Sequence, residues 1–237
     1  MIHNRRELQK LVELISASLV KWILPSDLYP VYNGKAGKLE VGVIFPGGGS
    51  PAIAARMEEL VTCGAQVIIA SGALGAFQHG MEVGDYVIPV KAISGEGTSQ
   101  YYQLKGRTAS ADPELVKIFE EACEKIGVKT FKGVVWTTDG FYRETRSWVK
   151  KLQKQGVLGV EMETSAIYSV AKFKGIKAAC LLRVSDKLAD LKWQTYWWST
   201  EYEKSVLETS PRIMFEFLKL LANNLSDLRK RVEEKSI

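Results

Sequence analysis

The segment Val157–Leu188 constrains the fold of this chain most strongly. Apolar residues recur at spacings of three and four from Glu161 and Glu163 onward, which predicts a helix with both carboxylates at its start. Gly175 is expected to end this helix, because glycine adopts positive φ at little cost. The apolar run Ala178–Val184 follows and predicts a buried strand. A helix followed directly by a buried strand is typical of α/β folds.

Three carboxylates of this segment are expected at one edge of the sheet. Glu161 and Glu163 stand at the start of the helix, and Asp186 stands where the strand ends. Ligands of open α/β sheets bind at the carboxyl ends of strands, so one crevice can receive all three groups. Such a crevice suits a ligand with several hydroxyls and an atom that takes up a proton. A structural role stays open on these residues alone, because glutamates are favoured in a first helical turn and aspartates in caps.

Several motifs in the same order along the chain resemble those of one enzyme family. They are FPGGGSPAIAARMEEL, GALGAFQHGMEVGDYVIP, EGTSQYY, VWTTDGFYRET and GVEMETSAIYSVA, the last followed by a strand that ends in VSD. The chain thereby resembles the nucleoside phosphorylase family, which includes uridine phosphorylase, hexameric purine nucleoside phosphorylase and the methylthioadenosine/S-adenosylhomocysteine nucleosidases. It is most similar to the archaeal and bacterial proteins grouped with uridine phosphorylase. The resemblance implies one α/β domain over residues 1–237, with a central mixed sheet flanked by helices.

The resemblance also implies roles for individual residues. Asp186 matches the acid that protonates a purine at N7. Glu163 and Met162 match the groups that hold the ribose 2′- and 3′-hydroxyls, and Glu161 supports them. Base binding falls to the segment that follows a strand predicted over 134–138: Phe141 is expected to stack on the base, and Arg143 is placed beside it. Asp186 favours purines or a broad range of bases, and uridine stays open.

Two glycine-rich stretches follow predicted strands. Gly47 and Gly48 follow the strand Leu39–Phe45, and Ser50 is expected to cap the next helix. Backbone N–H groups at such a helix start bind anions or hydroxyls, although glycines there also suit a plain tight turn. Gly72 and Ala73 follow the strand Gln66–Ser71, in a stretch expected to be a loop. By resemblance, both stretches line the ribose and anion pocket.

The sequence departs from the phosphorylases at the phosphate site. By resemblance, Ala70 stands where those enzymes have an arginine and Ala73 where they have a hydroxyl residue, and the early PGDP-like loop is not recognisable. Because a guanidinium fork is hard to replace at a phosphate site, three functions stay open. The first is cleavage of a ribonucleoside by phosphate to free base and ribose 1-phosphate, the second is hydrolysis, and the third is nucleoside binding without catalysis.

Composition limits the partners. The net charge of +5 is spread over separate predicted helices, which argues against nucleic-acid binding. The longest apolar runs have the length of strands and the start of the chain lacks a signal-peptide pattern, so we expect no membrane contact and a cytoplasmic protein. His3 and His79 cannot build a metal site alone, so the expected co-substrate is phosphate, with no metal and no cofactor.

Other patterns concern helices and assembly. Helices are predicted over Arg5–Lys21, Pro113–Ile126 and Pro211–Arg231. Five large rings between Leu191 and Glu203 predict either a cover for a pocket or a subunit contact. Together with the resemblance, this cluster predicts a homo-oligomer, a hexamer or a dimer.

Overall fold

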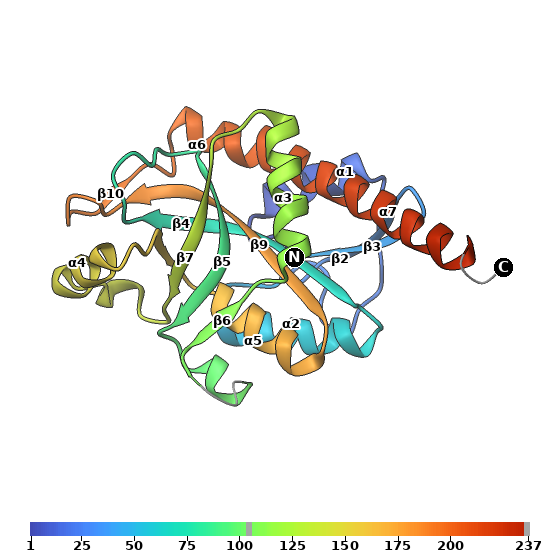
Figure 1. Ribbon diagram of the computed structural model, residues 1–237, viewed down its shortest axis with the longest axis horizontal. Helices are drawn as coiled ribbons and strands as arrows, with labels where there is room; N and C mark the ends of the chain where they lie inside the picture. The colour runs from blue at the N-terminus through green and yellow to red at the C-terminus, as the bar shows by residue number, and fades with distance from the viewer. Residues whose placement is uncertain (103–105, 235–237) are drawn as a thin grey trace.

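A mixed sheet forms the centre of the computed structural model, which describes residues 1–102 and 106–234 without the side chains of 225–234 (Figure 1). Its strands are β4 (Val67–Ala76), β5 (Tyr86–Ser94), β6 (Thr108–Ser110), β7 (Thr130–Thr137), β8 (Gly159–Glu161), β9 (Lys177–Lys187) and β10 (Gln194–Thr195). They lie in the order β10-β9-β4-β8-β7-β5-β6. β9 runs parallel to β4 and also pairs antiparallel with the start of β5, which closes the sheet on itself. The expected α/β fold with a central mixed sheet is confirmed.

Helices cover the sheet on opposite faces (Figure 1). One layer holds α1 (Arg5–Leu14), α3 (Pro113–Ile126) and α7 (Ser210–Glu234), and the other holds α2 (Ser50–Thr62) and α5 (Thr164–Lys174). The remaining helical segments are α4 (Arg146–Lys154), α6 (Thr200–Lys204), the 3-10 turns Thr98–Tyr101 and Phe141–Arg143, and the π-helical turn Ser205–Thr209 that leads into α7. None of the described helices is both long enough and apolar enough to cross a membrane.

The predicted helix over Pro113–Ile126 is confirmed with its boundaries. The Asp112 carboxylate accepts hydrogen bonds from the amides of Glu114 and Leu115, and Gly127 ends the helix at φ 76°. A side-chain cap at the start and a left-handed glycine at the end satisfy backbone groups that the helix itself leaves unpaired. Gly175 ends α5 in the same way, at φ 68°, as predicted.

A smaller antiparallel sheet of β1 (Ser18–Leu19), β2 (Val31–Ala36) and β3 (Leu39–Ile44) carries the chain to the glycine-rich stretch. The helix predicted over Arg5–Lys21 is therefore too long. It ends at Leu14 because the chain reverses at Ser16, where φ is 49°, and then enters β1.

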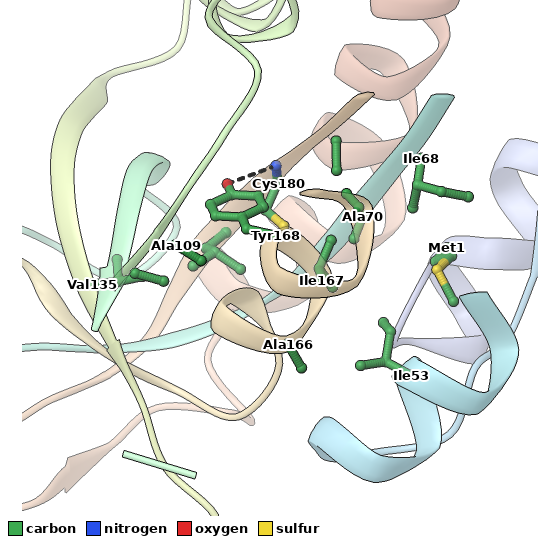
Figure 2. Close-up of a cluster of buried hydrophobic side chains, with 14 of the residues drawn as sticks. Met1, Ile53, Ile68, Ala70, Ala109, Val135, Ala166, Ile167, Tyr168 and Cys180 are labelled. Atoms are coloured by element: carbon green, nitrogen blue, oxygen red, sulfur yellow. Dashed lines mark hydrogen bonds between the residues drawn. The ribbon is translucent and has the colours of Figure 1, made fainter. Parts of the chain in front are cut away.

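Helix α5 is the centre of one hydrophobic core, shown in Figure 2. Every residue from Thr164 to Ala171 is buried, so this helix packs on all sides instead of showing one apolar face. The Tyr168 hydroxyl donates to the carbonyl of Pro89 at 2.8 Å and accepts from the amide of Cys180 at 3.2 Å. These bonds join the middle of α5 to β5 and β9, the strands that close the sheet.

A buried ion pair joins the first helix to β9. Arg183, which interrupts the apolar run of its strand, bonds to the Glu7 carboxylate at 2.5 Å, and both side chains are at most 2% exposed. The hydroxyl of Ser71 also donates to Glu7, and Ser210 lies 3.2 Å from the same Arg183 nitrogen. Buried charges of this kind persist only when they are paired and hydrogen bonded.

Candidate functional site

A cavity of about 350 Å³ lies beside the last residues of β4, β8 and β9. Backbone and side chains from eight separate segments line it: His3, Phe45, Gly47, Gly48, Ala73, Leu74, Gly75, Phe141, Glu144, Val160, Glu161, Met162, Glu163, Ser185, Asp186, Trp197 and Tyr202. The three carboxylates that the sequence placed in one crevice all line this cavity. So do the predicted base-stacking ring and the first predicted glycine stretch.

The structure leaves two predicted site residues outside the cavity. Arg143 is exposed at the end of its 3-10 turn and lines no part of the cavity wall. Gly72 is buried within β4, with Leu182 packed against it. The stretch Gly72–Ala76 is a strand and not the expected loop, because it pairs with β9 along its whole length. Ala73 is exposed and faces the cavity.

Glu161 serves as a cap for the segment around it. Its carboxylate accepts hydrogen bonds from the amides of Glu163 at 2.7 Å and Thr164 at 2.6 Å, and from the hydroxyl of Thr137. Burial raises its pKa. The predicted helix start is displaced accordingly, since Glu161 ends β8 and α5 begins at Thr164. A carboxylate with three donors holds the neighbouring Glu163 in place rather than reaching for a ligand.

Glu163 lies between two elements of the cavity wall. One of its oxygens accepts the amide hydrogen of Gly49 at 2.6 Å, and burial raises its pKa. The hydroxyl of Ser50 donates to the carbonyl of Met162 at 2.7 Å. Ser50 is therefore the first residue of α2 and not its cap; Gly49 takes the cap position at φ 82°. The two bonds fasten the start of α2 to the segment 162–163.

Asp186 is held by donors on both of its oxygens. The hydroxyl of Ser185 donates to Oδ1 at 2.5 Å, and the indole of Trp193 donates to Oδ2 at 2.9 Å. A side chain on Gly75 would come within 2.9 Å of Oδ2, so glycine is required where β4 passes this carboxyl. Burial raises the pKa of Asp186, while the bonds from Ser185, Trp193 and Trp197 oppose that rise.

Phe141 stands at the same end of the cavity as Asp186. Its ring meets the edge of Trp193 at 5.4 Å between centroids, and Trp193 meets Trp197 at 5.7 Å. Part of the aromatic cluster between Leu191 and Glu203 therefore covers a pocket. Trp197 itself lines the cavity, which agrees with one of the two uses predicted for the cluster.

Sequence reasoning missed several cavity residues. Glu144 lies just after the predicted aromatic, and burial raises its pKa to about 7, with a further contribution from the charge of Asp186. His3 bonds through Nδ1 to the carbonyl of Ser71 at 2.9 Å, and burial lowers its pKa to about 4, so the ring is neutral. Glu144 lies within the motif VWTTDGFYRET, which gave it no role, and no motif marks His3. Tyr202 of α6 was not missed: it belongs to the aromatic cluster predicted between Leu191 and Glu203, and it lines the cavity.

The charged side chains that line the cavity are acidic. Four carboxyl groups line it, whereas none of the described lining residues is a lysine or an arginine. Burial raises the pKa of each of these acids, because a low-dielectric site disfavours the charged form. Such groups bind hydroxyls and move protons near neutral pH.

The fold and the cavity define an α/β protein with an acidic site for a small polar ligand. A family profile of the Phosphorylase superfamily matches residues 4–219, and the chain belongs to this superfamily.

The chain is similar to phosphorylases that are named for different nucleosides. The chain is 33% identical over 169 residues to a uridine phosphorylase of Thermococcus kodakarensis, covering 66% of this chain and 61% of the relative. It is 31% identical over 164 residues to a guanosine phosphorylase of Halorubrum lacusprofundi, covering 68% and 66%. It is 35% identical over 159 residues to a DeoD-type purine nucleoside phosphorylase of Bacillus cereus, again covering 66% of each. The chain thus spans less than two thirds of the length of these relatives.

Proposed function

We propose that this protein cleaves the N-glycosidic bond of a purine ribonucleoside with phosphate, giving the free base and ribose 1-phosphate. The observation that carries the proposal is the convergence of Asp186, Glu163 and Phe141 on one cavity. The superfamily and the names of the relatives support the same reaction.

In this mechanism, the ribose lies against the segment 162–163. The Glu163 carboxylate accepts hydrogen bonds from the 2′- and 3′-hydroxyls, and the Gly49 amide holds that carboxylate in place. Phe141 stacks on the base. Fixing the sugar and the base on either side of the bond that breaks lowers the entropy cost of reaching the transition state.

Asp186 is the general acid. As a phosphate oxygen forms a bond to C1′, the C1′–N9 bond breaks and its electron pair moves into the base. The Asp186 proton passes to N7 of the purine, which neutralises the leaving group. The raised pKa of Asp186 keeps a larger share of the carboxyl protonated before this step.

Phosphate would lie near the start of α2. Gly47 and Gly48, just before α2, line the cavity, as does Ala73 of β4, and a helix start offers backbone N–H donors to an anion. Uncharged donors hold a dianion less tightly than guanidinium groups do. We therefore expect a high phosphate requirement.

Hydrolysis is the second candidate. The observation that favours it is the lack of lysine and arginine among the described residues of the cavity wall. Water needs no cation, so an acidic cavity of this kind accepts it as the nucleophile.

A paired assay tests these functions. Base release from inosine, guanosine, adenosine and uridine is measured with and without phosphate, and nucleoside binding is measured by calorimetry. Ribose 1-phosphate as the main product supports phosphorolysis. Equal rates without phosphate indicate a nucleosidase, and binding without base release indicates a non-catalytic protein.

The protein is also proposed to act as a homo-oligomer, a hexamer or a dimer. Exposed rings next in sequence to cavity residues support this assembly, among them Tyr142, at 87% exposure, and Trp198, at 77%. Large apolar rings of this kind are enriched in subunit contacts. Sedimentation velocity at micromolar concentration checks the assembly, and a monomer there would contradict it.

A further inference from the structure

The motif EGTSQYY contains a buried carboxyl group that the proposed mechanism does not use. Glu96 is only 4% exposed and lines no part of the cavity. Its carboxylate accepts hydrogen bonds from the hydroxyls of Ser94 and Ser165, both at 2.8 Å, and from the amide of Ser99 at 2.9 Å. Although burial raises the pKa of Glu96, these bonds outweigh it and hold that pKa below its usual value. All three partners are uncharged donors, and a buried carboxylate persists only where such bonds replace its hydration.

Ser165 links Glu96 to the wall of the cavity. It is the second residue of α5, and its hydroxyl donates to Glu96 while its amide donates to the Thr137 hydroxyl at 2.9 Å. Thr137 in turn donates its single hydroxyl proton to one oxygen of the Glu161 carboxylate. The other oxygen of Glu161 accepts the amide hydrogen of Glu163 at 2.7 Å. One chain of hydrogen bonds therefore runs from Glu96 to the backbone of Glu163.

Burial makes this hydrogen-bond chain sensitive to the loss of a member. Ser165 and Thr137 are fully buried, so water does not readily replace a partner that is removed. Without the Glu96 carboxylate, the Ser165 hydroxyl loses its acceptor and the start of α5 is less constrained. The Thr137 proton is then aimed less firmly at Glu161, which is the group that holds Glu163 in place.

We propose that Glu96 is a positioning residue of the ribose subsite, which sets the place of the Glu163 carboxylate through this hydrogen-bond chain without touching the ligand. The inference rests on the proposed function, in which Glu163 accepts hydrogen bonds from the 2′- and 3′-hydroxyls. A displaced acceptor costs most for a ligand that carries both hydroxyls, because these bonds depend on distance and angle. Loss of Glu96 should therefore weaken the preference for ribonucleosides over 2′-deoxyribonucleosides.

The test compares the calorimetric affinities for inosine and 2′-deoxyinosine in the unmodified protein, in Glu96→Ala, in Ser165→Ala and in the double variant. Glu59→Ala is the matched control, because Glu59 is a half-buried carboxylate that accepts a bond from Trp22, pairs with Arg56 and lines no part of the cavity. We expect the ratio of the two affinities to fall about 3- to 10-fold in each single variant of the hydrogen-bond chain, the range for losing one hydrogen bond. The double variant should fall no further than Glu96→Ala, and Glu96→Gln should retain more of the ratio, because an amide also bonds to a serine hydroxyl. The control keeps the ratio even where its thermal unfolding temperature falls.

Two outcomes overturn the inference: an unchanged ratio in both Glu96→Ala and Ser165→Ala, or an equal fall in Glu59→Ala, since the ratio would then report lost stability alone. Failure of the proposed function is distinguishable, because the unmodified protein would then neither bind nor cleave a nucleoside. In that case, hydrogen exchange of the Glu163 amide in the ligand-free protein decides. Exchange that becomes about 3- to 10-fold faster in Glu96→Ala and Ser165→Ala, but not in the control, supports the positioning of Glu163, and equal exchange in all four proteins refutes it.

Discussion

Trp193→Phe tests whether the aromatic cluster sets the protonation of Asp186. The substitution keeps an aromatic ring against Phe141 and Trp197 but removes the indole N–H that donates to Asp186 Oδ2 at 2.9 Å. A donor to a carboxyl stabilises its ionised form, so the loss of the donor should raise the pKa of Asp186.

The size of the effect follows from the contact. A hydrogen bond to a charged group contributes about 1.5–3 kcal/mol, and the lower end applies because Trp193 is 47% exposed. Since one pKa unit corresponds to about 1.4 kcal/mol, we expect a rise of about one unit. A general acid loses activity as pH rises through its pKa, so the basic limb of the pH profile should move about one unit upward.

The assay is kcat/KM for a purine nucleoside as a function of pH. Trp148→Phe serves as the control, because Trp148 packs on Trp136 and its indole donates to no described residue. A basic limb that stays within about 0.3 units of its original position would refute the reasoning, since a shift that small is under about 0.5 kcal/mol. A downward shift would show that the indole favours the protonated carboxyl.

Three further predictions concern the same elements. Asp186→Asn should lower purine nucleoside cleavage about 100-fold or more in a steady-state assay, because the amide cannot transfer the proton. The thermal unfolding temperature should be retained, because the amide keeps the shape of the carboxyl. Unchanged turnover would remove Asp186 from the mechanism. Glu163→Gln should weaken ribonucleoside binding about 10-fold in calorimetry, because a charge-assisted bond to one hydroxyl is lost. Binding of 2′-deoxyribonucleosides should weaken less. If the affinity for both kinds of nucleoside falls equally, Glu163 has only the structural role of bonding to Gly49. Arg183→Met should lower the free energy of unfolding, measured in urea, by about 3–5 kcal/mol, because Glu7 keeps a buried charge without its partner. The double variant that also carries Glu7→Gln should lose less stability. A double variant as unstable as Arg183→Met would contradict this account.

Local sequence patterns predicted the elements whose ends depend on nearby residues. Asp112 and Gly127 mark the two ends of α3, and Gly175 marks the end of α5, because caps act within one helical turn. The pairing of β9 with β5 left no such local mark. For Gly72, the sheet overrode the local preference of glycine for turns, since pairing with β9 kept this residue in a strand.

The same distinction applies to the candidate site. Glu163, Phe141 and Asp186 could be predicted because they belong to motifs that resemble a family, and the fold brings them to one cavity. Glu144 lies in the same motif as Phe141 but was given no role, whereas His3 could not be predicted, because its position depends on a contact between distant segments. His3 is bonded to Ser71, 68 residues away.

The acids of the cavity differ in how many hydrogen bonds the protein itself donates to them. Glu161, Glu163 and Asp186 were expected in one ligand crevice, and the structure gives Glu161 three donors of its own, so this residue holds Glu163 in position. Asp186 has donors on both oxygens, but Glu144 has none among the described residues. A ligand can therefore hydrogen-bond to Glu144 without displacing a described protein donor. Because a site built to hydrogen-bond a substrate group rejects analogues that lack it, the function we propose implies that the choice between nucleosides is made at the base end of the cavity.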